Sequence, residues 1–185
     1  MLRFALTAIA ITLSAVPLSA QLGQVTRVDT LGANFDWKKE GKGTISDFDF
    51  LVGEWTFRFQ NRAGAALGVV QTGTWKTIKK QEGLLEDVWT LGTSEPTLTW
   101  RSFNRAKNIW EFQGLKTSRG SWDPGVAWSN GDERFVVQTF AGQTLARIRY
   151  QKVTANHFLW RADVSPDQGQ TWLLDQWVLE ANRVK

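Results

Sequence analysis

The sequence predicts an all-β domain, an antiparallel up-and-down barrel that follows a mobile N-terminal arm. Three observations predict this fold. Large apolar residues recur at every second position from about residue 55 onward, turn-forming residues separate these runs, and no stretch has the period of a long amphipathic helix. The runs indicate about eight to ten strands, spaced about 8–12 residues apart, which is the pattern of a sandwich or a barrel.

The alternation is clearest at the start of the domain, where Trp55, Phe57 and Phe59 share one face of a predicted strand. The same period recurs at residues 85–91, 98–100, 110–112, 135–137, 148–150, 158–160 and 172–178. Short turns join only antiparallel neighbours, and closing the sheet removes its two exposed edges. We therefore expect a closed meander, whose interior is just wide enough for side chains or for one small ligand.

Turns are expected where Asn, Asp, Gly and Pro gather between the runs. These positions are 61–64, 104–105, 123–125, 130–132, 141–142 and 165–169. Residues 46–51 are expected to form a capped single turn that leads into the first strand.

Residues 1–20 have the features of an export signal. Arg3 provides the positive start, residues 4–16 are mostly apolar, and Leu18-Ser19-Ala20 offers a cleavage site before Gln21, with residues 13–15 as an alternative site. The apolar run is shorter than the roughly 20 residues that span a bilayer, although an uncleaved anchor is the other possibility.

The chain is thus divided into a signal (1–20), an arm or linker (21–45) and a barrel domain (46–185). We expect an exported protein, periplasmic or secreted, with no attachment to the membrane after cleavage. The glycine-rich and weakly periodic arm has no predicted structure.

The composition excludes several classes of function. The 185 residues include no cysteine, so disulfides, thiolate metal sites and thiol catalysis are excluded, and eleven tryptophans remain to build the core. The formal net charge is +4, and both signs are scattered along the chain. No nucleic-acid partner is expected, because its binding surface would be clustered and more basic.

The opening of the domain carries a family resemblance. Gly53-x-Trp55 resembles the first-strand motif of lipocalins and the wider calycin barrels. The longer segment 47–55, DFDFLVGEW, resembles a family of exported bacterial domains of unknown function with a calycin-like barrel. In that family an ExW strand, a tryptophan-rich middle and a closing SxDxGxTW hairpin follow. The corresponding pieces here are 86–89, which departs from ExW by one residue, then Trp100, Trp110, Trp122 and Trp128, and finally 165–172.

The resemblance covers roughly residues 46–180 and implies a lipocalin-like barrel. It also implies that Trp55 packs across the bottom of the barrel, with Arg183 from the last strand stacked over it. It implies no catalytic residue, because none is established for the family.

The segment Ser165–Trp172 also matches the aspartate box of sialidases. The turn chemistry explains the match without the enzyme, since Asp167 can accept hydrogen bonds from backbone donors and Gly169 can take a positive φ. A sialidase needs several such boxes and a far longer chain. We therefore interpret this segment as a structural hairpin.

No catalytic residue, metal site or cofactor is predicted. His157 is the only histidine, and the chain has neither a GxSxG elbow nor the further ligands that zinc requires. Some haem proteins use a single axial histidine. A residue at a strand entrance is more often a solvated turn residue, which is the interpretation we prefer here.

Charged residues inside the strands are the candidates for a lined cavity, because a buried charge must be paired. They are Glu86, Arg101, Glu111, Arg147, Arg149, Arg161 and Asp175. For any single one of them a solvent-facing position is favoured, and a slip of one residue would reverse every assignment. The predicted ligand-binding residues are Glu86, Trp89, Arg101, Trp110, Arg149, Trp160 and Arg161.

The leading hypothesis is a binding protein for a small, largely apolar ligand in an aromatic-lined cavity. A second is an enzyme that uses Glu86 or Glu111 as a general base on a small hydrophobic substrate. A third is a filled barrel that acts through protein–protein contacts. The sequence leaves the oligomeric state open.

Overall fold

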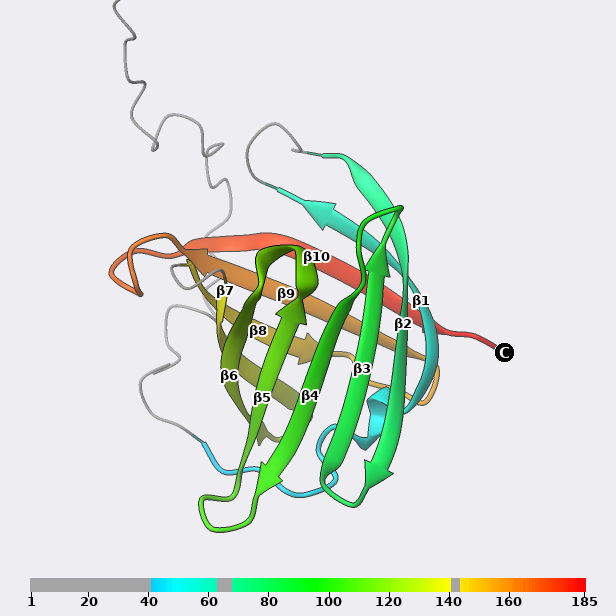
Figure 1. Ribbon diagram of the computed structural model, residues 1–185, viewed down its shortest axis with the longest axis vertical. Coiled ribbons are helices and arrows are strands. Elements are labelled where there is room, and N and C mark those ends of the chain that lie inside the picture. Colours follow the sequence, from blue (N-terminus) through cyan, green and yellow to red (C-terminus); the bar gives the residue numbers. More distant parts are fainter. Residues whose placement is uncertain (1–40, 63–67, 141–143) are drawn as a thin grey trace, which may run out of the picture.

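The computed structural model describes residues 41–62, 68–140 and 144–185, and this part of the chain is a closed antiparallel β-barrel (Figure 1). The predicted fold class is confirmed. The strands are β1 (Gly53–Asn61), β2 (Val70–Gln81), β3 (Leu84–Leu91), β4 (Thr97–Asn104), β5 (Ile109–Lys116), β6 (Ser121–Asn130), β7 (Glu133–Phe140), β8 (Thr144–Gln151), β9 (His157–Ser165) and β10 (Leu173–Arg183).

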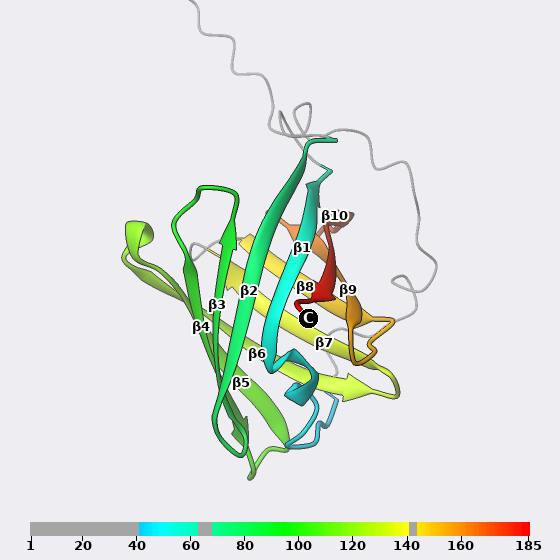
Figure 2. The same ribbon diagram turned by 90° about the vertical axis from the view of Figure 1, so that its right-hand side faces the viewer.

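Every strand pairs antiparallel with its neighbours in the sequence, and β10 returns to pair with β1. The closing register runs from Trp55 opposite Arg183 to Asn61 opposite Trp177, so the sheet has no free edge (Figure 2). In the described residues, no helix is long and apolar enough to cross a membrane. The predicted signal (1–20) and most of the predicted arm (21–40) lie outside these residues.

The last residues of the predicted arm lie against the barrel. The Gly43 amide donates to the Asn108 carbonyl at 2.6 Å, and the Trp110 indole donates to the Thr44 carbonyl at 2.9 Å. Asp47 then accepts two hydrogen bonds from Thr44, both at 2.8 Å. The single turn that follows is a 3-10 helix, Asp49–Leu51, with no side-chain cap of its own.

This turn closes one end of the barrel, where Trp55 and Arg183 meet as the lipocalin resemblance implies. The Arg183 guanidinium lies 4.1 Å from the centre of the Trp55 ring. It also donates to the carbonyls of Val52 and Phe50 at 2.7 and 2.9 Å, while the Trp55 indole donates to Leu51 at 2.7 Å. One arginine thereby ties the last strand to both the turn and the first strand.

Aromatic rings fill the space above this closed end. Phe48 meets Trp110 and Tyr150 edge to face at centroid distances of 5.5 and 5.8 Å, and Trp55 meets Phe158 at 4.9 Å. All five side chains are at most 1% exposed. Edge-to-face pairs at these distances are favourable beyond their buried area. The closed end is therefore solid, and any hollow lies toward the other end.

One predicted turn is wrong. Residues 123–125, Asp-Pro-Gly, lie inside β6. The chain turns before this strand, at a short 3-10 helix, Thr117–Arg119, which ends at Gly120 with φ 61°. A Cβ on Gly125 would lie 2.3 Å from the Phe112 ring. This glycine thus makes room for an aromatic side chain on the neighbouring strand rather than permitting a turn.

The β9–β10 hairpin confirms the structural interpretation of its aspartate box. Asp167 accepts hydrogen bonds from the Thr171 amide at 2.9 Å, the Thr171 hydroxyl at 2.7 Å and the Ser165 hydroxyl at 2.8 Å. Gly169 takes φ +92°, and Trp172 lies over the Arg147 guanidinium at 4.3 Å. The motif holds a tight connection and anchors the strand that follows it.

These hydrogen bonds predict a pH-dependent stability. Donation from Thr171, and then from Ser165, lowers the pKa of Asp167 from 3.8 to about 2. A carboxyl with a depressed folded-state pKa stabilises the fold above its unfolded pKa, and that stabilisation disappears as the pH falls through the folded value. Asp167→Asn should therefore lower the unfolding midpoint in urea at pH 7, and the difference from wild type should shrink between pH 4 and pH 2. A difference that stays constant over this range would contradict the assignment.

Candidate ligand-binding cavity

The two faces of each strand decide which side chains can form a site, because successive residues point to opposite sides of the sheet. The barrel interior contains a cavity whose lining defines the inner face. It is lined by Phe59, Trp75, Trp89, Thr97, Thr99, Arg101, Phe112, Asp123, Val136, Gln138, Phe140, Ile148, Tyr150, Trp160 and Leu179. Three of the predicted site residues, Trp89, Arg101 and Trp160, belong to this lining.

The cavity is narrow at depth and wide at its mouth. The inner part offers about 60 Å³ of free space to water-sized molecules, whereas small-molecule pockets usually measure about 300–1,000 Å³. A wider hollow of about 430 Å³ adjoins it and shares five lining residues with it. These are Phe59, Trp89, Thr97, Phe140 and Trp160. Together they form an aromatic funnel that narrows toward the closed end.

An ion pair lies at the inner end of the funnel. The Arg101 Nε donates to Asp87 at 2.5 Å, and the two side chains are 6% and 1% exposed. The Thr77 hydroxyl donates to the other Asp87 oxygen at 2.7 Å. Burial on its own would lower the pKa of Arg101, but the charge of Asp87 raises it above its ordinary value, so the guanidinium remains charged. The pair is electrically balanced.

Aromatic rings surround the Arg101 guanidinium. Its carbon lies 5.2 Å from the centre of the Phe112 ring, 5.4 Å from Phe48 and 5.9 Å from Trp75, within the range of cation–π attraction. These rings help to hold the arginine in one position.

Tyr150 lines the same region and is 1% exposed. Burial raises the pKa of its hydroxyl to about 12, against the opposing effect of the positive charge on Arg101. Arg101 and Trp160 are its hydrogen-bonding neighbours, and both are donors. The hydroxyl therefore stays protonated at neutral pH, and its own hydrogen remains available to an acceptor in the cavity.

A second balanced pair lies two strands away from Arg101, where Asp123 belongs to β6 and Arg119 to the short 3-10 helix before it. The Arg119 guanidinium donates to Asp123 at 2.7 Å, and the Asp123 side chain is only 2% exposed. Gln138 donates to the Asp123 backbone carbonyl at 3.3 Å. At the mouth, Glu95 accepts the Ser118 amide at 3.0 Å.

The two glutamates predicted as cavity carboxylates lie on the outer face, so that expectation is wrong. Glu86 follows the inward-facing Leu85 on β3, points outward and forms an ion pair with Lys80 at 3.4 Å. Glu111 alternates with Trp110 and Phe112 on β5 and binds Lys107 at 2.8 Å. The inward carboxylate of β3 is Asp87, one residue along from the predicted Glu86.

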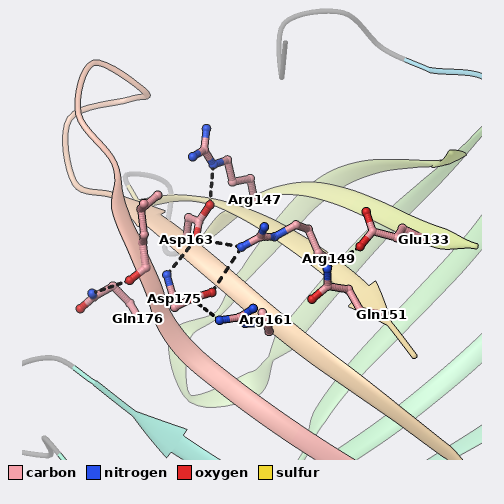
Figure 3. A network of polar contacts seen from close by, with 9 residues as sticks. Glu133, Arg147, Arg149, Gln151, Arg161, Asp163, Asp175 and Gln176 are labelled. Atoms are coloured by element: carbon pink, nitrogen blue, oxygen red, sulfur yellow. Dashed lines mark hydrogen bonds and ion pairs between the residues drawn. The ribbon is translucent and has the colours of Figure 1, made fainter. Parts of the chain in front are cut away.

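The predicted Arg149 and Arg161 also lie outside the lumen, since Ile148, Tyr150 and Trp160 occupy the inner positions of the same strands. Figure 3 shows that they converge with Arg147 on the carboxylates of Asp163 and Asp175, which come from the neighbouring strands β9 and β10.

This outer network is buried although it does not face the cavity. Arg147, Arg149, Asp163 and Asp175 are at most 6% exposed. Asp163 accepts the Arg147 Nε and the Asp175 amide, both at 2.8 Å, and Asp175 binds both Arg149, at 3.3 Å, and Arg161. Asp175 has φ 49° and sits where the β9–β10 register shifts. The network thus joins three strands at an irregularity in the sheet.

The remaining predicted residues are placed as follows. Trp110 faces inward but lies among the rings that fill the closed end, below the cavity. His157 begins β9 on the outer face, with its Nε2 3.2 Å from Glu180. In the described part of the chain, no group of three or more His, Asp or Glu side chains is placed to hold a metal ion.

Sequence reasoning missed Asp87, Asp123 and Tyr150. The sequence did contain a signal for Asp87, because it lies on the same face of the predicted strand as Leu85, Trp89 and Leu91. Asp123 was hidden by the Asp-Pro-Gly segment that resembled a turn. Tyr150 was recognised only as an alternating apolar residue.

The chain matches no protein-family model and no curated protein. Among solved structures it resembles the S-type phycobiliprotein lyase CPES from Guillardia theta, with 12% identity and a TM-score of 0.47, over 75% of this chain and 90% of that one. It also resembles EF1p2_mFAP2b in complex with DFHBI, with 12% identity and a TM-score of 0.37, over 76% and 98% of the two chains. Similarities of this size assign neither a ligand nor an activity to this protein.

The buried ion pair predicts a large loss of stability when one partner is removed. Arg101→Met should lower the free energy of unfolding by about 3–5 kcal/mol, because Asp87 is then left buried without its counter-charge. Urea unfolding followed by tryptophan fluorescence measures the change.

The double variant Arg101→Met/Asp87→Leu should regain most of this loss, because neither charge remains. Arg58→Met is the matched control, since Arg58 is exposed on the outer face of β1, and its effect should stay within about 0.5 kcal/mol. If Arg101→Met cost no more than Arg58→Met, the ion pair would not be buried as described.

Proposed function

We propose that this protein is an exported binding protein that holds a small, largely apolar ligand in the funnel of its barrel. The observation that carries this proposal is the aromatic lining shared by the 430 Å³ mouth and the narrow inner cavity. A planar or ring-containing body fits the mouth, where Trp89, Trp160 and Trp177 supply flat apolar faces. Concave, mostly apolar sites with a few polar groups are typical of small-molecule binding.

An enzyme that uses a cavity glutamate is less well supported. A general base in a cavity needs a raised pKa, but Glu111 lies outside, where its hydrogen bond from Lys107 lowers the pKa of its carboxyl. Glu86 lies outside as well. The inward carboxylates Asp87 and Asp123 are each bound to an arginine.

The filled barrel is the stronger second candidate, because one observation favours it. The inner cavity offers only about 60 Å³, and aromatic rings fill the closed end below it. Under this alternative, the mouth would be a surface hollow without a small-molecule ligand. A binding measurement separates the two.

The neutral fluorescent probe N-phenylnaphthylamine tests small-molecule binding. We expect its emission to rise and shift to the blue on saturable binding to wild type. Thr97→Trp places a large ring where the mouth meets the inner cavity and should weaken binding about tenfold or more, as should Trp160→Ala.

Trp100→Ala is the matched control for loss of a tryptophan, because Trp100 is 39% exposed on the outer face of β4, and this variant should bind like wild type. Circular dichroism checks that each variant remains folded. No saturable binding to wild type would favour the filled barrel. Equal loss in Trp100→Ala and Trp160→Ala would place the probe elsewhere than in the funnel.

The export part of the proposal has its own test, which is the N-terminus of the protein recovered from outside the cytoplasm. Mass spectrometry should give a chain that begins at Gln21, or at Val16 if the alternative site is used. Ile9→Arg puts a charge in the middle of the apolar run and should trap the precursor in the cytoplasm. A protein that carries Met1 and remains in the cytoplasm would contradict export.

A further inference from the structure

We propose that the inner end of the funnel recognises an uncharged hydrogen-bond acceptor, a carbonyl-type oxygen, at the tip of an otherwise apolar ligand. This inference rests on the proposed function and adds the chemical class and the orientation of the ligand. Three observations support it independently: the hydrogen-bond donors at the inner end, the charge balance and the dimensions of the cavity.

Three polar side chains of the cavity lining, Arg101, Tyr150 and Trp75, present N–H or O–H donors near one another. A guanidinium has five N–H donors and no acceptor. Among the described residues, the Arg101 guanidinium donates to Asp87 through Nε and has Tyr150 as a second hydrogen-bonding neighbour. Further N–H donors of this guanidinium therefore remain for a ligand. The Tyr150 hydroxyl accepts from its neighbours and keeps its own hydrogen for donation. The complementary group on a ligand is therefore an acceptor.

The indole of Trp75 adds a further observation. This side chain lines the cavity and is 6% exposed, yet its buried Nε1 has no hydrogen-bond partner among the described residues. A buried donor without an acceptor costs free energy, and such groups are uncommon in folded proteins. A small rotation of the ring toward a bound acceptor would satisfy it. This unsatisfied donor lies beside Arg101, whose guanidinium carbon is 5.9 Å from its ring.

The charge balance excludes a strongly favoured anion. Asp87 lies 2.5 Å from the Arg101 Nε and cancels most of its field at the cavity. Arg119 and Asp123 cancel in the same way at the start of β6. A carboxylate that entered this space would lose its hydration without meeting an uncompensated positive charge. A neutral carbonyl has a much smaller desolvation cost and still satisfies the donors.

The dimensions set the orientation of the ligand. A water molecule needs about 10–15 Å³ of such free space, so the 60 Å³ of the inner cavity admits only a few non-hydrogen atoms. The body of the ligand must therefore remain in the 430 Å³ mouth. A ligand with a narrow polar tip and a broad apolar body fits this shape.

Three naphthalene probes that share one ring system and one dimethylamino group test the inference. They are acedan, which carries a neutral ketone, the corresponding naphthoate, which carries an anion, and the parent dimethylaminonaphthalene, which carries neither. We expect wild type to bind acedan about three- to tenfold more tightly than the parent compound, and the naphthoate most weakly. The emission of bound acedan should lie to the red of its emission in hexane, because its carbonyl accepts a hydrogen bond.

Two variants that preserve shape sharpen the test. Tyr150→Phe removes one of the three donors, so it should weaken acedan binding about threefold and shift its emission to the blue, while parent binding stays unchanged. Asp87→Asn removes the charge that compensates Arg101. The affinity for the naphthoate should therefore rise about tenfold relative to the affinity for acedan. Thr74→Val is the control for loss of a hydroxyl, since Thr74 is exposed on the outer face of β2, and it should change nothing.

The outcomes distinguish this inference from the proposed function. If all three probes bind wild type equally, or if the naphthoate binds best, recognition of a neutral acceptor is wrong while small-molecule binding stands. If none of the three binds, both fail. If Tyr150→Phe weakens the parent compound as much as acedan, the hydroxyl acts through packing and the inference is overturned.

Discussion

A closed barrel imposes one constraint on everything else in this protein: each strand has an inner and an outer face, and a buried charge must find its partner on its own face. The pairing of β1 with β10 creates this division. Inside, Arg101 is compensated by Asp87. Outside, Asp163 and Asp175 bind the arginines of β8 and β9. The inner pair lies at the end of a cavity, whereas the outer network joins three strands at a shift in register, so the same chemistry serves two purposes.

Much of the fold could be predicted from the sequence, because local patterns determine it. The alternation of Trp55, Phe57 and Phe59, the turn at 130–132 and the hairpin around Asp167 depend on residues close together in the chain. The Trp55–Arg183 contact, which joins the two ends of the domain, came instead from the resemblance to lipocalins. The turn prediction at 123–125 was wrong because Gly125 makes room for Phe112 on a neighbouring strand. A contact between two strands leaves no pattern in the local sequence.

The candidate site was harder to predict, because it depends on which face of each strand is inner. On β4 the inner face carries Thr99 and Arg101, while Trp100 faces the solvent. A rule that places apolar residues inside assigns this strand the wrong way round. On β8 and β9 the error is the opposite one, since Arg149 and Arg161 are shielded on the outer face by partners distant in sequence. A shift of one residue in the assigned faces thus decides whether Glu86 or Asp87 is the inward carboxylate of β3.

The pairing of every interior charge with its opposite, among the residues described, also bears on how a guest would arrive and leave. Long-range attraction speeds association only where a patch of one sign creates a field, and dissolved salt weakens that field. Across the wall and rim of the funnel, Arg101 and Asp87, Arg119 and Asp123, and Lys116 and Glu95 present both signs side by side. Loading of an apolar guest would then proceed at nearly the same rate in dilute and in concentrated salt.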